Sequence, residues 1–285
     1  MLIGAIEAGG TKIICAVGDG SGEIRAKQSI PTREPEETLQ EVKAFFSAYD
    51  LDALGVGSFG PVDLNRDSGT YGTILNTPKA AWKHFNLLGR LQADYEIPVY
   101  IDTDVNAACL AEYHHGAGID VNSCLYITVG TGIGAGLVQN GQTFQGKSHP
   151  EMGHIMVPKH GTDPFTGVCP YHGNCLEGMA SGPAIEERHG RKGHLLDDHP
   201  YVWELEAHYL AHAIVTYTLV LFPERIILGG GVMKQKLLLS LIREKVSRLL
   251  NGYVDVGEMD KFITAPALDD EQGVKGAIAL AAGNV

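Results

Sequence analysis

Two cysteines and two histidines occur in one stretch of the chain at spacings that suit a metal ion. Cys169, His172 and Cys175 follow one another at three-residue intervals, and His154 lies fifteen residues before the first of them. Two thiolates and two imidazoles form a closed tetrahedral set that suits zinc, and closed sites are structural. The alternative is two buried cysteines beside a surface histidine, but this stretch is too rich in glycine and proline to pack as core. The sequence therefore predicts a structural zinc site.

Carboxylates flank the same stretch. Glu151 lies three residues before His154, and Glu177 follows Cys175 by two residues. A zinc ion that fixes this loop would also fix both acidic side chains without contacting them. We therefore expect the metal site to be the scaffold of an active site.

Three glycine clusters could bind phosphate: Glu7-Ala8-Gly9-Gly10-Thr11-Lys12, Gly130-Thr131-Gly132-Ile133-Gly134 and Gly229-Gly230-Gly231. Glycine lets the backbone approach an anion, while threonine hydroxyls and a lysine add donors and charge. Neither common nucleotide fingerprint fits, and one such turn alone is more often a tight hairpin. The three clusters together favour a phosphate site. Glu7, at the end of the first strand, could hold Mg²⁺ directly or through water.

The chain alternates strand-like and helix-like segments, which predicts the α/β class. We expect strands over 2–8 and 12–17 around the first glycine turn, and over 125–129 and 135–138 around the second. Setting Ile6 on Ile127 places Gly9 on Gly130, so the sequence predicts a duplicated architecture.

Helix signals complete this pattern. A helix is predicted over 104–115, after Asp102-Thr103 and before Gly116 at the C-cap position. Further helices are predicted over 206–222, which ends at Pro223, and over 234–250 and 276–282, with a short strand over 225–228. Residues 189–203 are expected to form a solvated loop, and its histidines receive no function.

Composition limits the possible functions. The 285 residues are 44% hydrophobic and 20% charged, as in an ordinary soluble protein. No run approaches the roughly 20 apolar residues that span a bilayer, and the N-terminus lacks a signal peptide. Five cysteines, an odd number, favour a reducing compartment, so a cytoplasmic location is expected. The net charge of −12 argues against nucleic acid as a partner.

These motifs together resemble the ROK family of sugar kinases and repressors, and most closely its bacterial fructokinase branch. The resemblance implies an actin-like ATPase fold, which is a duplicated ribonuclease H-like fold of two α/β lobes with a cleft for ATP between them. The expected lobes are 1–116, onto which a final helix near 272–285 could pack, and 117–271. The similarity runs in family order from residue 3 to about 280 through 7–12, 102–108, 130–136, 149–154, 169–177 and 229–232.

The resemblance also implies roles for single residues. Asp104 matches the catalytic carboxylate, and the residue before it, Thr103, contacts the sugar. Glu151, His154 and Glu177 match ligands of sugar hydroxyls, and the other ring nitrogen of His154 binds zinc. The phosphate loops correspond to Gly9, Gly10, Thr11, Lys12, Gly130, Thr131, Gly132 and Gly134, while Gly229, Gly230 and Gly231 lie beside the adenosine.

The chain departs from the family pattern at three positions. Glu7 replaces the usual Asp of the first turn, and its longer side chain could reach Mg²⁺ through a different water. Thr103 stands where glucose-type enzymes commonly have Asn, which changes the sugar contact. His172 stands where a third metal-binding Cys is usual, and zinc is compatible with either residue.

The implied function is that of an ATP-dependent hexose kinase which transfers the γ-phosphoryl group of Mg·ATP to the 6-hydroxyl of D-fructose. Sugar and ATP are the expected partners, with structural zinc, no membrane partner and a homodimer. The alternatives are a glucokinase, an N-acetylmannosamine kinase, a sugar-responsive regulator and a zinc-binding interaction module. A regulator of this family carries a DNA-binding segment before the kinase-like fold, and no such segment fits before Leu2.

Overall fold

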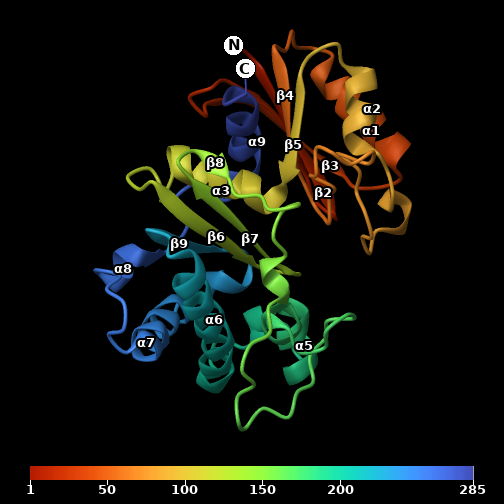
Figure 1. Ribbon diagram of the computed structural model, residues 1–285. Coiled ribbons are helices and arrows are strands. Elements are labelled where there is room, and N and C mark those ends of the chain that lie inside the picture. The colour runs from red at the N-terminus through yellow and green to blue at the C-terminus, as the bar shows by residue number, and fades with distance from the viewer. Residues whose placement is uncertain (285) are drawn as a thin grey trace. The chain divides into compact units, whose positions relative to one another are not determined.

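The computed structural model describes residues 1–284, which form two compact units (Figure 1). Unit 1 comprises Met1–Ile119, Gly136–Pro150 and the chain from Ala267 onward. Unit 2 comprises Asp120–Ala135 and Glu151–Pro266. Unit 1 is therefore assembled from three separate segments of the chain.

A mixed sheet with strand order β3-β2-β1-β4-β5 forms the centre of unit 1. β1 (Ile3–Ala8) pairs antiparallel with β2 (Lys12–Gly18) and parallel with β4 (Ala53–Ser58). β3 (Ile24–Pro31) and β5 (Val99–Thr103) are its edges. Except for the edge strand β3, the strands of this sheet are mostly buried because helices cover both faces.

The two helical layers of unit 1 lie on opposite faces of its sheet (Figure 1). α1 (Pro35–Phe46) and α2 (Leu87–Asp94) contribute the larger apolar side chains of one core cluster. α9 (Gln272–Ala282) covers the other face with small residues and packs against α3 (Asp104–His115). A Cβ on Gly276 of α9 would lie 1.7 Å from the Ala107 carbonyl oxygen, so this close helix contact requires glycine.

The second sheet repeats the strand order of the first. Its order is β10-β9-β6-β7-β8, so β8-β7-β6-β9-β10 corresponds to β3-β2-β1-β4-β5. Three residues separate β6 from β7, as three separate β1 from β2, which agrees with the predicted superposition of Gly130 on Gly9. The predicted duplication is confirmed. The strands are β6 (Ser123–Val129), β7 (Ile133–Gln139), β8 (Gln142–Thr143), β9 (Arg225–Gly229) and β10 (Ile263–Thr264).

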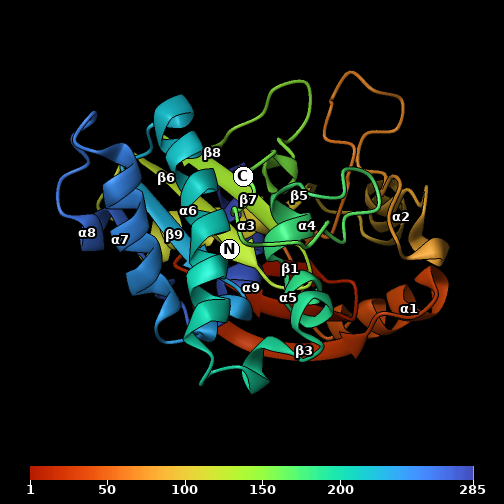
Figure 2. The same ribbon diagram turned by 90° about the horizontal axis from the view of Figure 1, so that it is seen from below.

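Helices also form part of unit 2. α6 and α7 lie side by side (Figure 2). Within residues 1–284, no helix combines the length and the apolar character needed to cross a bilayer. The helices are α4 (Leu176–Ala180), α5 (Gly182–His189), α6 (Pro200–Leu221), α7 (Leu238–Leu250) and α8 (Met259–Phe262). Short 3-10 helices span Ala80–Trp82, Met152–His154, Gly193–Leu195 and Val232–Lys234.

Three predicted helix starts are wrong, and so is the loop over 189–203. α6 begins at Pro200, because proline suits the first helical turn and the side chains of Val202 and Trp203 are buried. α7 begins at Leu238, four residues later than predicted, after the 3-10 helix Val232–Lys234. α9 begins at Gln272, four residues earlier than predicted.

Candidate active site

The four residues predicted to bind zinc converge in unit 2. One donor atom from each of His154, Cys169, His172 and Cys175 lies within 4.8 Å of the other three. His154 Nδ1 is 3.4 Å from Cys175 Sγ and 3.7 Å from Cys169 Sγ, and His172 Nδ1 is 3.7 Å from Cys169 Sγ. Tetrahedral zinc with bonds of about 2.0–2.3 Å places its donor atoms roughly 3.3–3.8 Å apart. The donor set therefore fits a zinc ion.

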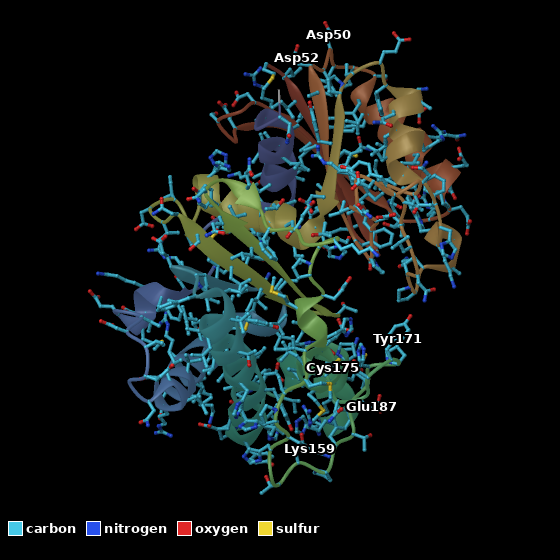
Figure 3. All side chains as sticks on the ribbon, in the orientation of Figure 1. Asp50, Asp52, Lys159, Tyr171, Cys175 and Glu187 are labelled. Atoms are coloured by element: carbon cyan, nitrogen blue, oxygen red, sulfur yellow. The ribbon has the colours of Figure 1, made fainter. Side chains whose placement is uncertain are left out.

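A tight turn presents these ligands. The backbone N–H of Gly173 donates to the Cys169 carbonyl at 2.9 Å, and the N–H of Cys169 donates back to the Gly173 carbonyl at 3.3 Å. Gly173 has φ of +64°, which glycine adopts without steric cost. Tyr171, at the tip, points outward with 69% of its side chain exposed, while Cys175 is buried (Figure 3). The turn thus brings Cys169 and Cys175, which are buried, together with His172, which is exposed.

The environment of Cys175 favours a bound cation. The pKa of its thiol is raised to about 11, mainly by burial and additionally by the neighbouring Cys169, although a backbone hydrogen bond from Gly178 acts in the opposite direction. A buried thiolate needs a positive partner, and a metal ion supplies one while it deprotonates the thiol. Zinc thus matches the chemistry of the donors as well as their spacing.

Glu177 connects the metal loop to the second glycine turn. Its Oε2 accepts a hydrogen bond from the Ile133 backbone N–H at 2.9 Å, and its Oε1 lies 4.0 Å from His154 Nε2. A Cβ on Gly132 would lie 2.7 Å from Oε2, so the carboxylate rests directly on this glycine. Glu151 is exposed, and its carbonyl accepts a hydrogen bond from the His154 N–H at 3.0 Å. The roles of Glu151, His154 and Glu177 as sugar ligands stay predictions.

A pocket of about 760 Å³ opens beside the second glycine turn, within unit 2. Gly130, Thr131 and Gly231, three of the residues predicted to bind ATP, lie in its wall. Its size is that of a small-molecule site. Further wall residues escaped the sequence analysis, among them Ile185, Glu186, Lys192, His194, Trp203 and Gln235. Lys192 and His194 reach the pocket through the 3-10 helix Gly193–Leu195, and no periodic sequence pattern marks them.

The glycines of the third cluster, Gly229 to Gly231, have two different structural roles. A Cβ on Gly229 would lie 2.3 Å from the Tyr126 hydroxyl oxygen, and one on Gly230 would lie 2.4 Å from the Val129 carbonyl oxygen. Gly230 also has φ of +94°, which favours glycine. The first two glycines therefore allow β9 and its turn to pack against β6. Only Gly231 lines the pocket, with open space at its Cβ position.

Asp104 is the first residue of α3, at the end of β5 in unit 1. Its Oδ1 accepts a hydrogen bond from the Val105 N–H at 2.9 Å, and the positive end of the helix dipole favours its charged form. Thr103 is 2% exposed, and its hydroxyl oxygen caps the helix by accepting from the Asn106 N–H at 3.1 Å. Buried Asp102 holds Asn106 through a 2.6 Å hydrogen bond from the side-chain amide. These bonds fix the direction of the Asp104 backbone.

Glu7 has the environment of a cation ligand. Burial, and next the charge of Asp104, raise its pKa to about 6, although Lys12 and Lys27 act in the opposite direction. Within residues 1–284, its buried Oε2 has no hydrogen-bond partner. A Cβ on Gly273 of α9 would lie 2.2 Å from the Glu7 carboxyl carbon, so the glycine makes room for the carboxyl group. An unpartnered oxygen on a buried carboxylate fits the predicted Mg²⁺ contact.

The first glycine turn is held from β3. The Gly9 N–H donates to the Lys12 carbonyl at 3.0 Å, and the Thr32 hydroxyl donates to the Gly9 carbonyl at 2.7 Å. The Thr32 N–H donates to the Thr11 carbonyl at 3.0 Å. Thr11 and Lys12 themselves are exposed. Their assignment to phosphate, like that of Gly9 and Gly10, stays a prediction.

The ROK family model matches residues 3–284, and the chain belongs to the ROK family. A relative from Bacillus subtilis (strain 168), whose fructokinase name is provisional, is 49% identical over 284 residues, covering 98% of this chain and 95% of its own. A fructokinase of Pediococcus pentosaceus is 43% identical over 281 residues, covering 99% of this chain and 98% of its own. The family resemblance is thereby confirmed, and it supports a sugar and ATP as substrates.

The fold is similar to that of solved ROK sugar kinases. A ROK hexokinase from Thermus thermophilus superimposes with a TM-score of 0.84 and 26% identity, covering 100% of this chain and 99% of that one. The two five-stranded sheets of residues 1–284 therefore belong to the actin-like ATPase fold, which confirms the predicted class.

Proposed function

We propose that this chain is a fructokinase that transfers the γ-phosphoryl group of Mg·ATP to the 6-hydroxyl of D-fructose. The observation that carries the proposal is the similarity to fructokinases over nearly the whole chain. The geometry of both units supports it, because each holds groups of the kind that phosphoryl transfer needs for positioning and for charge stabilisation.

In the proposed reaction, unit 1 supplies the proton acceptor. Asp104 orients the 6-hydroxyl and takes its proton as the hydroxyl oxygen bonds to the γ-phosphorus. The glycine turn from Gly9 to Lys12 holds phosphate, and Thr103 lies beside the sugar. Mg²⁺ held at Glu7 would neutralise charge on the phosphates when bound.

Unit 2 supplies sugar ligands and the nucleoside pocket. Glu151, His154 and Glu177 accept hydrogen bonds from sugar hydroxyls. Glu177 Oε2 already accepts the Ile133 N–H, so Oε1 is the oxygen with more acceptor capacity left for the sugar. Zinc on His154, Cys169, His172 and Cys175 fixes this loop. The nucleotide occupies the pocket beside Gly130 and Gly231, and the rest of the turn, Thr131, Gly132 and Gly134, contributes to phosphate binding.

The preference for fructose depends on Thr103. An asparagine at this position offers a carbonyl and an amide to neighbouring ring hydroxyls. Thr103 offers one short hydroxyl, which has its own hydrogen and only one lone pair left, because its oxygen already accepts the Asn106 N–H. Fewer contacts and more room favour a ketose ring. A difference in available space alone changes the kcat/KM of one sugar relative to another by only about 10–200-fold. We therefore expect mannose and glucose to be poor substrates that are still accepted.

Three further expectations belong to this proposal. The functional lobes are 1–116 with the final helix, and 117–271. The protein is a homodimer, as the family resemblance implies. It works in the cytoplasm, which agrees with five cysteines that form no disulfide within residues 1–284.

A coupled assay of ADP release tests the proposal. The ratio kcat/KM is measured for fructose, mannose, glucose and N-acetylmannosamine, and the product is analysed for the position of the phosphate. Fructose should give the highest ratio, with phosphate on its 6-oxygen. A kcat/KM for glucose equal to or above that for fructose would overturn the fructose assignment. If none of the four sugars caused release of ADP, the kinase assignment would be overturned.

A further inference from the structure

Lys79 reaches the first glycine turn from a different part of unit 1. A Cβ built on Gly10 would lie 3.8 Å from Lys79 Cε, the last carbon before the ammonium group. The lysine lies 69 positions further along the chain, between β4 and α2. Its charged end is therefore beside the turn that is proposed to hold phosphate.

The backbone of Lys79 is held firmly. It directly precedes the 3-10 helix Ala80–Trp82, its carbonyl accepts the Trp82 N–H at 2.9 Å, and its own N–H donates to the Thr77 hydroxyl at 3.3 Å. Trp82 is fully buried, and its indole N–H donates to the Arg33 carbonyl at 2.7 Å. The backbone of Lys79 is therefore already ordered, and only its side chain has to be ordered when it binds an anion.

The charge of Lys79 is uncompensated. Three other lysines of unit 1 are ion-paired: Lys27 and Lys275 with Glu271, at 2.7 and 3.4 Å, and Lys43 with Asp94, at 3.1 Å. For Lys79, which is partly buried, residues 1–284 provide no ion-pair partner. The chain has 34 acidic residues against 22 basic ones, so a carboxylate partner would be easy to provide. An ammonium kept free beside a glycine turn is suited to an anionic ligand.

Lys12 follows the same glycine turn, but it lines a different pocket. Lys12 lines a separate pocket of about 600 Å³ together with Lys27 and the acidic residues Asp269, Asp270 and Glu271. Its charge also acts on Glu7, whose pKa it lowers. Lys79 is thus the lysine near this turn whose charge is not balanced by neighbouring acids.

We propose that the Lys79 ammonium binds the γ-phosphoryl group during its transfer; this inference rests on the function proposed above. The sugar hydroxyl oxygen forms a bond to the γ-phosphorus, the bond from that phosphorus to the bridging oxygen of ADP breaks, and Asp104 takes the hydroxyl proton. Lys79 stays protonated and donates hydrogen bonds to a non-bridging oxygen of the moving group. Its positive charge stabilises the transition state in a preorganised position.

Three variants test this role. Lys79→Met keeps the length of the side chain and removes its charge, Lys79→Arg keeps the charge, and Lys83→Met is the control, since Lys83 is exposed at the other end of the same 3-10 helix. Lys79→Met should lower kcat by about 10²-fold, the scale for one lost transition-state donor. The KM for the sugar should change by less than about threefold. The kcat of Lys79→Arg should exceed that of Lys79→Met by at least about tenfold, and the kcat of Lys83→Met should equal that of the wild type.

A binding measurement separates this role from a structural one. Calorimetry without sugar gives the affinities for ADP and for a non-hydrolysable ATP analogue, which differ by the γ-phosphate. Lys79→Met should weaken binding of the analogue by about tenfold more than binding of ADP. Two results together would overturn the proposal in a Lys79→Met protein with the same melting temperature as Lys83→Met. These are a kcat above a third of the wild-type value and an unchanged ratio of the affinity for the ATP analogue to the affinity for ADP. If the wild type phosphorylates no sugar, the proposed function fails, but the affinity ratio still decides the role of Lys79.

Discussion

The Glu177 carboxylate and the Ile133 backbone N–H are joined by a 2.9 Å hydrogen bond. Glu177 follows the metal ligand Cys175 by two residues, and Ile133 follows the glycine turn at the start of β7. One side chain therefore links the position of the metal loop to the position of the turn. Within unit 2, a disturbance of either element is expected to reach the other.

We expect one tightly bound zinc ion per chain. Elemental analysis of protein purified without added metal should give about one zinc per chain, and Cys175→Ala should abolish it and lower the melting temperature by about 5–10 °C. Cys124→Ala removes a buried cysteine of β6 and is the matched control, which should retain the metal. Less than a tenth of a zinc ion per chain in folded, active protein would contradict the prediction.

Substitution of Glu177 should separate its two contacts. Glu177→Gln keeps an oxygen that can accept the Ile133 N–H but loses the charge, so the KM for the sugar should rise about tenfold while the Kd for ATP changes by less than about threefold. Glu177→Ala removes both contacts and should raise both constants about tenfold. Glu187→Ala, at an exposed position of α5, is the control. Equal ATP affinity in the Gln and Ala variants would show that the bond to Ile133 does not support the turn.

Replacement of Asp104 by Asn should remove the proton acceptor and keep the shape. We expect kcat to fall by about 10²–10⁴-fold, the usual scale for a general base. The Kd for ATP should barely change, and Asp67→Asn, in an exposed loop, should be fully active. A variant with more than a third of the wild-type kcat would place the base at another residue.

Glu206 of α6 should make stability fall as pH rises. Burial raises its pKa well above the ordinary value of 4.5, although Arg188 acts in the opposite direction, and both of its oxygens lack hydrogen-bond partners within residues 1–284. The folded chain binds this proton more tightly than the unfolded chain, so the contribution to stability is complete below pH 4.5 and is lost progressively as the pH rises from there through the raised pKa of the folded state.

Urea unfolding of Glu206→Met at several pH values measures this effect. The variant should exceed the wild type in free energy of unfolding by about 1–3 kcal/mol at pH 8, and the difference should shrink towards pH 4. Glu187→Met, where the carboxylate is exposed, should show no such trend. A pH-independent difference would mean that packing, not ionisation, accounts for it.

The parts of the fold that the sequence predicts well are those whose ends are marked by capping residues or by glycine turns. α3 runs over Asp104–His115 as predicted, because Thr103 caps its start and Gly116 its end. The glycine turns fix the ends of β1, β2, β6 and β7. The predicted start of α6 was wrong because the first turn of the helix follows a stretch rich in histidine and aspartate. Trp203 is buried through tertiary packing, which the local sequence does not indicate.

Within the candidate site, spacing along the chain was enough to predict that the four metal ligands meet, since they belong to one loop. The same analysis could not find Lys79 or His194. Lys79 approaches Gly10 from 69 positions away, and His194 enters the pocket wall through a short 3-10 helix. Contacts between distant segments carry no local pattern, so only the folded chain shows them.

The place of α9 in unit 1 has a consequence for synthesis on the ribosome. The sheet face that contains Ile3 and Ala5 is covered by Val274, Ala277 and Ile278, which the ribosome adds about 270 residues later. At about 5–20 residues per second, the first 119 residues wait roughly ten to thirty seconds for this cover. During that interval the nascent chain exposes an apolar sheet face, which makes it a natural client for a chaperone that binds near the exit tunnel.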